Sequence, residues 1–142
     1  MTLDQARELL TTIFREVIDG GEYDRFDDFF RPDAVEHTAM GDAVGKDGFT
    51  GFLEGFRAAL PDFHHDLGDF WMVSPDVVVF EVRVTGTFSG EFMGQQGHGE
   101  RLDLYVTNAA RLRDGRVTEH WALGPESASR LLAQLGVQPA AA

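Results

Sequence analysis

The chain has 142 residues, a length that suits one domain burying roughly 68–70% of the surface of its unfolded form. Its formal net charge of −12 would repel phosphate backbones, and the absence of cysteine excludes disulfides, thiolate nucleophiles and zinc–thiolate sites. No apolar run reaches the ~18–20 residues of a membrane span, and the first residues carry no secretory signal. We therefore expect a cytoplasmic protein with neither a nucleic-acid nor a membrane partner.

Three helices are predicted in the first half of the sequence. Thr2 and Gln5 fit a capping box, and apolar residues at helical spacing follow as far as Gly20. A short Phe-rich helix comes next, and a third helix stacks phenylalanine and leucine on one side until Pro61 stops it. The expected helices span residues 3–19, 23–31 and 46–60, with a short strand and loop at 33–45.

Four strand-like segments follow, with little room for helices between them. The alternation of Val78, Phe80, Val82 and Val84 with other residues indicates a strand with one buried face, so Glu81 and Arg83 should point outward. Asp114-Gly115 is typical of a two-residue hairpin turn. The strands are expected at 63–73, 77–88, 100–113 and 116–124, followed by a closing helix at 125–135 and a disordered tail at 137–142.

Helices first and a sheet second predict an α+β fold made of one domain over residues 1–142. We expect a curved antiparallel sheet wrapped around the N-terminal helices, which forms a cone with an internal pocket. Such hollows are the usual sites for small molecules. The glycine-rich loop from Gly90 to Gly99 has no phosphate-binding context and is expected to form a mobile rim or lid over this pocket.

The last hairpin supplies candidate site residues. With Asp114-Gly115 in the two central turn positions, the register pairs Leu112 with Val117, Ala110 with Glu119, Asn108 with Trp121 and Val106 with Leu123. That face is apolar apart from Asn108 and Glu119, so it should line the pocket. His120 should then point to the opposite face, where packing or a subunit contact is expected.

A metal cluster is not expected at His64, His65 and Asp66, because adjacent side chains diverge on a strand.

The order and spacing of several motifs along the chain resemble those of the SnoaL-like polyketide cyclase family, which belongs to the nuclear transport factor 2-like superfamily. The features that carry this resemblance are the initial helix, the Phe-rich second helix, His37, Gly45, Pro61-Asp62, Gly86-Thr87 with Gly90, Glu119-His120-Trp121 after the Asp-Gly turn, and Gln134-Leu135-Gly136.

The resemblance implies an intramolecular aldol cyclase that acts on polyketide esters without a cofactor. In this family an aspartate a few residues beyond the tryptophan removes a proton α to a carbonyl and then protonates the new alkoxide. Here that position falls on Pro125 or near Ser127, depending on the direction of counting, and Glu126 lies between them. Glu126 is either the carboxylate on a longer arm or a residue of the first helical turn that favours the helix dipole.

We therefore predict a small-molecule enzyme of polyketide or natural-product metabolism that uses no cofactor and no metal. The catalytic candidates are Glu126, Glu119 and His37, and the substrate-binding candidates are Asn108, Trp121, Leu123, Phe56 and Trp71. The alternatives are a dehydratase-, isomerase- or epoxide hydrolase-like relative, or a protein of the same fold that binds a hydrophobic ligand without turnover. Members of the family commonly pair through the outer sheet face, so the expected partners are a small hydrophobic substrate and a second copy of the chain.

Overall fold

The computed structural model describes residues 1–38, 40–122 and 125–137, with the side chains of residues 125–128 excluded. Six helical segments occur in the described residues: α1 (Leu3–Thr12), the π-helical η1 (Ile13–Ile18), the 3₁₀ turn η2 (Tyr23–Arg25), α2 (Phe26–Phe29), α3 (Gly45–Ala59) and α4 (Pro125–Leu135). These agree with the predicted helices, except that the second one ends early because β1 begins at Phe30.

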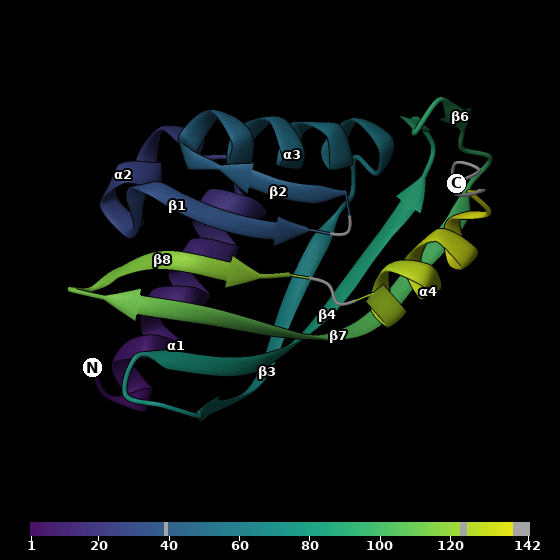
Figure 1. Ribbon diagram of the computed structural model, residues 1–142. Coiled ribbons are helices and arrows are strands. Elements are labelled where there is room, and N and C mark those ends of the chain that lie inside the picture. The colour runs from purple at the N-terminus through teal and green to yellow at the C-terminus, as the bar shows by residue number, and fades with distance from the viewer. Residues whose placement is uncertain (39, 123–124, 138–142) are drawn as a thin grey trace.

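The strands form one curved six-stranded sheet in the order β2-β1-β8-β7-β4-β3. They are β1 (Phe30–Thr38), β2 (Gly41–Val44), β3 (His64–Met72), β4 (Val77–Phe88), β7 (Glu100–Arg113) and β8 (Arg116–Trp121). All neighbours are antiparallel except β1 and β8, which are parallel. In Figure 1, α1 passes behind the sheet, α3 runs along its β2 edge and α4 lies beside β7. The predicted α+β class is confirmed.

The first helix, α1, has a capped N-terminus and continues directly into the π-helical η1. Thr2 and Gln5 form the predicted capping box. At the other end, the backbone N–H of Asp19 donates to the carbonyl of Phe14 at 2.8 Å, an i to i+5 contact that widens the helix into η1. The wider turn buries the adjacent pairs Ile13-Phe14 and Val17-Ile18 together. The predicted helix at 3–19 therefore covers this segment, but its 3.6-residue spacing does not distinguish the π-helical turn from an α-helix.

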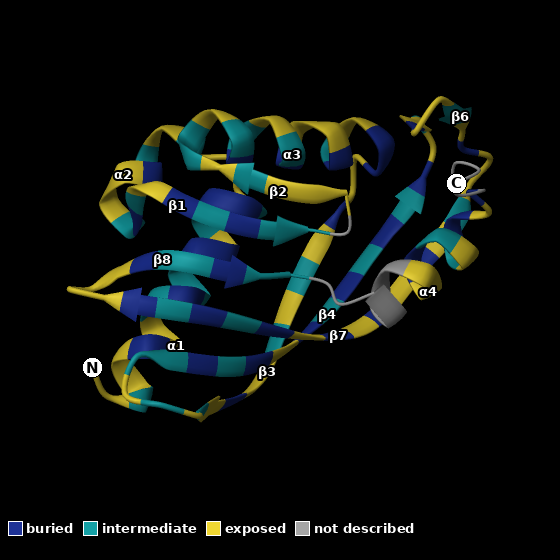
Figure 2. Cartoon of the chain, in the orientation of Figure 1, coloured by how far each residue is buried: buried dark blue, intermediate teal, exposed yellow. Residues whose placement is uncertain are grey.

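The sheet separates an apolar inner face from an outer face, as the alternating colours along its strands show in Figure 2. On β4, the predicted inward residues Val78, Phe80, Val82 and Val84 are all buried. Glu81 is exposed, and Arg83 pairs on the outer face with Asp103, 2.7 Å away. The predicted division of this strand is confirmed.

The register of the last hairpin differs from the prediction beyond its tip. Leu112 pairs with Val117 as expected, but Thr118 is an extra residue in a β-bulge, and Glu119 then lies opposite Arg111. His120 consequently pairs with Ala110, and Trp121 pairs with Ala109. One inserted residue turns every following side chain to the other face, so the predicted inward placement of Glu119 and Trp121 is wrong.

The loop from Gly90 to Gly99 folds into a small hairpin of β5 (Glu91–Phe92) and β6 (Gln95–Gln96). The backbone N–H of Gly90 donates to the carbonyl of Ala59 at 3.0 Å, and a Cβ at this glycine would lie 2.0 Å from the carbonyl oxygen of Ala58. Phe92 packs on Phe56 at a ring distance of 5.2 Å. The hairpin is therefore anchored on the end of α3, and its role as a mobile lid stays a prediction.

The C-terminal end of the described chain packs against the core. Val137 is buried, and its N–H donates to the carbonyl of Leu132, so the predicted tail does not begin at residue 137. The remainder of that tail, residues 138–142, lies outside the described residues. Among the helices described, none is both long and apolar enough to cross a membrane.

Candidate functional site

A narrow cavity of about 50 Å³ lies between the inner face of the sheet and the helices. Its apolar wall consists of Phe14, Ile18, Phe52, Leu53, Phe56, Phe63, Val84, Leu104, Val106, Ala122 and Leu131. Among the described residues, four polar side chains interrupt this wall: Glu36, His65, Asn108 and His120. A largely apolar hollow with a few converging polar groups is typical of a small-molecule site.

Glu36 and His120 form a buried pair on neighbouring parallel strands. The register of β1 and β8 places them side by side, and both point inward. Nδ1 of His120 lies 2.6 Å from Oε1 and 2.7 Å from Oε2 of Glu36. Only 7% of Glu36 and 5% of His120 is exposed. The rings of Phe14 and Phe80 contact the imidazole at 5.9 and 6.0 Å, so the pair sits in apolar surroundings.

This arrangement prepares His120 for proton transfer. A carboxylate accepts only, so Nδ1 of His120 carries the proton and donates it to Glu36. The neutral ring then keeps a free electron pair on Nε2, and Nε2 is buried without a hydrogen-bond partner. Glu36 would also stabilise the imidazolium that forms when Nε2 accepts a proton. The pair can thus act as a general base.

Asn108 adds an uncharged hydrogen-bonding group to the same wall. It lies on β7 two residues from Ala110, the partner of His120, so the two side chains are diagonal neighbours on the inner face. Its Oδ1 is buried and makes no hydrogen bond. An unsatisfied buried group costs about 1–3 kcal/mol, and a ligand that supplies the missing partner would recover that cost. Asn108 and His120 can therefore hold one polar group of a ligand between them.

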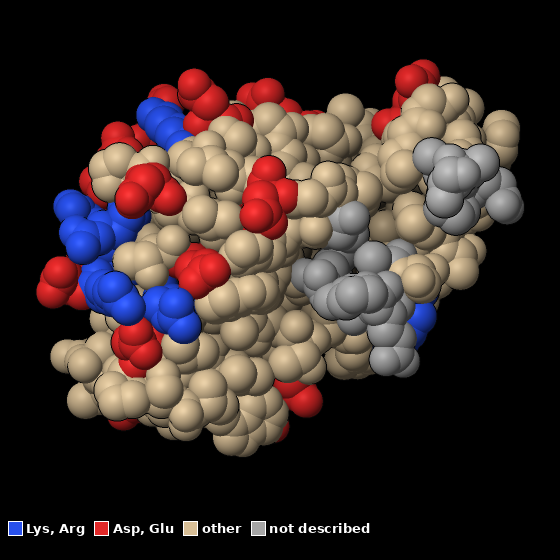
Figure 3. Space-filling model, viewed as in Figure 1, with Lys and Arg blue, Asp and Glu red and all other residues tan. Residues whose placement is uncertain are grey.

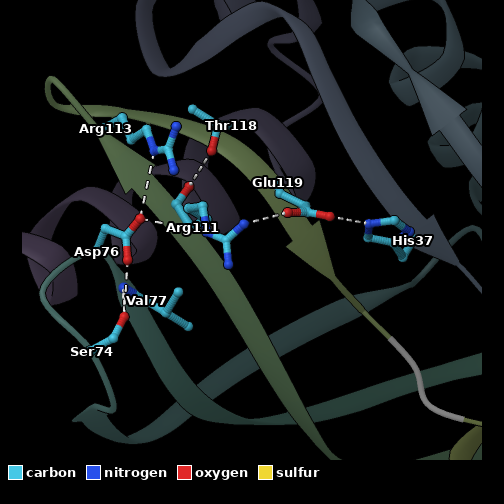
Figure 4. Close-up of polar contacts among 8 residues, drawn as sticks. All are labelled: His37, Ser74, Asp76, Val77, Arg111, Arg113, Thr118 and Glu119. Carbon is cyan, nitrogen blue, oxygen red and sulfur yellow. Dashed lines mark hydrogen bonds and ion pairs between the residues drawn. The ribbon is translucent and has the colours of Figure 1, made fainter.

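Glu119 and His37, two of the predicted catalytic residues, contact each other on the outer face instead of lining the cavity. Nε2 of His37 lies 2.6 Å from Oε2 of Glu119, and Nη1 of Arg111 donates to Oε1 of Glu119 at 3.1 Å (Figure 4). The hydrogen bond that His37 donates to Glu119, helped by Asp42, raises the pKa of His37 above its usual 6.5, although burial works in the opposite direction. Trp121 stacks on His37 at 5.3 Å.

The other predicted site residues are divided between the two faces. Phe56 and Asn108 lie in the cavity wall. Trp71 is 46% exposed and pairs with Val79 on the outer face, because a register shift between Leu67 and Phe70 sets the alternation of β3; its expected place in the pocket is wrong.

Two further candidates lie at the edge of what the structure describes. Leu123 falls outside the described residues. The backbone of Glu126 lies in the first turn of α4, as the helix-start interpretation requires, but its side chain is outside the description.

Sequence reasoning missed Glu36, His65 and His120. The signal for Glu36 is the alternation from Ala34 to Glu36 on one face of a strand, which places a carboxylate among inward residues. His120 was assigned to the outer face because the bulge at Thr118 carries no sequence mark. For His65 the sequence suggests only a metal cluster with His64 and Asp66, which is not expected on a strand. Among the described residues no group of three or more His, Asp or Glu side chains could hold a metal ion.

The comparison with known proteins agrees with this architecture. IdmH of Streptomyces antibioticus, named as a polyketide cyclase, is 28% identical with a TM-score of 0.73, over 92% of this chain and 98% of that one. AclR of Streptomyces galilaeus, named as a hydroxylase, is 26% identical with a TM-score of 0.75, over 97% and 100%. A SnoaL-like protein of Jannaschia sp. CCS1 shares the fold at 20% identity, with a TM-score of 0.81 over 96% and 94%.

No curated protein sequence matches the chain. The family model for the SnoaL-like polyketide cyclases matches residues 8–135, nearly the whole length and including every strand of the cavity wall. The chain therefore belongs to the SnoaL-like polyketide cyclase family.

Proposed function

We propose that the protein catalyses a proton-transfer reaction at a carbon α to a carbonyl, as in the intramolecular aldol cyclisation of a polyketide. Nε2 of His120 removes the α proton, the enolate carbon attacks a second carbonyl of the same molecule, and the resulting alkoxide takes up a proton. The observation that carries this proposal is the buried Glu36–His120 pair, whose Nε2 has no partner.

Glu36 and Asn108 have supporting roles in this reaction. Glu36 holds the imidazole ring and offsets the positive charge that His120 gains. The unpaired Oδ1 of Asn108 can accept a hydrogen bond from a hydroxyl or enol group of the substrate and so orient the substrate beside Nε2 of His120. Placing the reaction in an apolar cavity strengthens both effects, since water does not screen them.

The polyketide substrate class is supported by the family and by IdmH, which is named as a polyketide cyclase. AclR is named as a hydroxylase, so similar chains are assigned different reactions. The reaction class proposed for this chain therefore rests on the Glu36–His120 pair and not on either name.

The size of the cavity constrains how a substrate enters. About 50 Å³ holds one or two waters and no ring system. Phe52 and Phe56 line both this cavity and a surface groove bounded by β5 and Met40. Phe52 is only partly buried, so its displacement would join the two spaces. We infer that the substrate enters between α3 and the β5–β6 hairpin.

The same narrowness favours a second candidate, a protein that binds a small apolar ligand without turnover. Such a protein needs no base, and the unpaired Oδ1 of Asn108 and Nε2 of His120 would then serve only to hold a ligand. Turnover separates the two candidates.

The test uses two probes, an aromatic β-hydroxyketone whose retro-aldol cleavage releases a fluorescent aldehyde and a linear polyketide methyl ester. His120→Asn and Glu36→Gln should each lower kcat at least 10²-fold. His37→Asn and Glu119→Gln are the matched controls, because they alter an imidazole–carboxylate pair of the same 2.6 Å length on the outer face. Turnover that survives His120→Asn, or that is lost only in Glu126→Gln, would contradict the proposal, as would a wild type inactive on both probes.

We also propose that the outer face pairs with a second copy of the chain. Trp71, Val79, Ala109 and Trp121 follow one another in register across four strands. Figure 3 shows Lys and Arg gathered at one end of this side of the molecule, near the hairpin tip, whereas the charged side chains nearer its middle are Asp and Glu. Light scattering should give a dimer that Trp71→Arg converts to a monomer. A monomeric wild type would refute this pairing.

A further inference from the structure

His65 is a second imidazole in the cavity wall, and the proposed cyclisation leaves it without a role. It lies on β3 opposite Val84, which also lines the cavity. The rings of Phe14 and Phe63 contact it edge-on at 5.1 and 4.4 Å. Because Phe14 also contacts His120, one phenyl ring touches both imidazoles. The two histidines therefore line the same cavity from β3 and β8, two strands that β4 and β7 separate in the sheet.

Asp19 holds His65 in the way that Glu36 holds His120. Oδ1 of Asp19 lies 2.7 Å from Nδ1 of His65, and Oδ2 accepts the backbone N–H of the same residue at 2.9 Å. Asp19 follows the π-helical η1, whose widened turn brings this carboxylate to the start of β3. With Nδ1 bound to a carboxylate, the second ring nitrogen of His65 remains for another partner.

The two pairs differ in what lies beside them. Both histidine side chains are buried, but His65 also borders an outer cleft of about 400 Å³, which His120 does not line. The charged and titratable side chains along that cleft are Arg7, Arg15, Asp19, His64 and Asp66. Nδ1 of His64 lies 3.1 Å from Oδ2 of Asp19, and His64 is 55% exposed. The carboxylate of Asp19 can offset positive charge on the ring of His65, and the cleft gives this residue a route for proton exchange with solvent, as a general acid requires.

We propose that His65 is a second proton-transfer residue of this cavity and acts as the acid that complements the base His120. This inference rests on the proposed function. As Nε2 of His120 takes the α proton, the His65 imidazolium gives a proton to the alkoxide oxygen formed with the new C–C bond. After the product leaves, His120 carries one extra proton and His65 lacks one. A water in the emptied cavity returns that proton from His120 to His65, so the cycle balances without a further reactant.

An alternative is that Asp19 and His65 only fasten η1 to β3. Both roles predict that the pair stabilises the fold, so stability does not distinguish them. The dependence of kcat on pH does, because an acid and a base give a bell-shaped profile and loss of the acid removes its alkaline limb. In retro-aldol cleavage the two residues exchange roles, and two limbs are again expected.

The experiment measures retro-aldol cleavage of the aromatic β-hydroxyketone by the full chain across pH 4.5–9. His65→Gln keeps the backbone N–H that Asp19 accepts, and it should lower kcat about 10²-fold and remove one limb of the profile. His64→Gln is the matched control, since it alters the neighbouring imidazole beside the same carboxylate and should stay within twofold of wild type. Asp19→Asn should lower kcat about 10-fold, an effect between those of the two histidine variants.

The two proposals fail in different ways. If His120→Asn is inactive but His65→Gln keeps the wild-type rate and both limbs, the role of His65 is wrong and the proposed function stands. If His120→Asn retains activity, the proposed base is wrong. An equal loss in His64→Gln and His65→Gln would assign the effect to the Asp19 contacts in general and would overturn the specific role of His65.

Discussion

Nδ1 of His120 and Oε1 of Glu36 lie 2.6 Å apart because β1 and β8 run parallel and in register at these two positions. β1 and β8 come from opposite ends of the sequence, 84 residues apart, and all other neighbours in this sheet are antiparallel. In the described part of the chain, this one parallel contact builds the only hydrogen-bonded imidazole–carboxylate pair whose two members both line the cavity.

Glu36→Ala and Glu36→Gln should separate the structural from the chemical role of this carboxylate. The alanine variant leaves the Nδ1–H of His120 buried without an acceptor, so the free energy of unfolding should fall by about 1–3 kcal/mol. The glutamine variant keeps an acceptor oxygen and should lose about 1 kcal/mol or less, yet its turnover should fall as far as that of the alanine variant. Urea unfolding and kcat check the two expectations, and equal stability of both variants would contradict the first.

The bulge at Thr118 accommodates one residue more than the facing strand offers, and deleting Thr118 tests this. The deletion makes Val117 and Glu119 consecutive opposite Leu112 and Arg111, so the bulge disappears while Glu119, His120 and Trp121 keep their observed partners and faces. The variant should therefore still unfold cooperatively and keep its turnover, and a loss of more than about 4 kcal/mol in the free energy of unfolding would contradict this account of the bulge. Thr118→Ala keeps the bulge and loses only a 3.3 Å bond to the carbonyl of Arg111, so it should cost about 1 kcal/mol at most.

The same bulge marks the limit of prediction from the sequence. Strand and helix positions follow from local spacing, and the predicted strands 77–88 and 100–113 and the closing helix at 125–135 match the structure at both ends. The facing of β8 depends on one inserted residue, which period-2 reasoning cannot detect. A register that omits the bulge at Thr118 therefore places Trp121 on the inner face, where the structure has His120.

Contacts between distant segments were the second limit. Glu36 and Asp19 each become important only beside a histidine far away in the sequence, at His120 and His65. No local pattern connects either pair. The Phe-rich character of the cavity, in contrast, was predictable, because Phe56 repeats at helical spacing with the apolar residues of α3.

Phe52→Ala should open the cavity toward the surface groove. Its ring lines both spaces, so truncation should raise the binding of a fluorescent apolar dye several-fold and cost about 1–3 kcal/mol of stability, less than a fully buried phenylalanine. Phe29→Ala is the matched control, since Phe29 is also partly buried but contacts Arg25 away from the cavity. Equal dye binding by the two variants would show that Phe52 does not close the cavity.

The outer pair should make stability depend on pH in a defined direction. The pKa of His37 is raised, chiefly by its hydrogen bond to Glu119, so the folded state favours the imidazolium. The resulting stabilisation is fully present below about pH 6.5 and is lost as the pH rises through the raised pKa. Glu119→Gln should lower the pKa of His37 in an NMR titration. The difference in the free energy of unfolding between the wild type and this variant should become smaller as the pH rises above the raised pKa of His37 in the wild type. Asp42→Asn should also lower the pKa of His37, because Asp42 accepts the weaker of the two hydrogen bonds that raise it. A gap that widens with pH would contradict this sign.

Gly51→Ala should stabilise α3 without changing turnover. Gly51 is exposed within the helix, and a Cβ there meets no atom within 4 Å, so the gain in helix propensity of about 0.5–1 kcal/mol is not offset by a clash. Gly90→Ala is its counterpart, because its Cβ would lie 2.0 Å from the carbonyl oxygen of Ala58 and should cost about 1–3 kcal/mol or more. Thermal unfolding checks both signs. If Gly51→Ala is more stable but turns over several-fold more slowly, α3 must deform during substrate entry, and the entry route past Phe52 gains direct support.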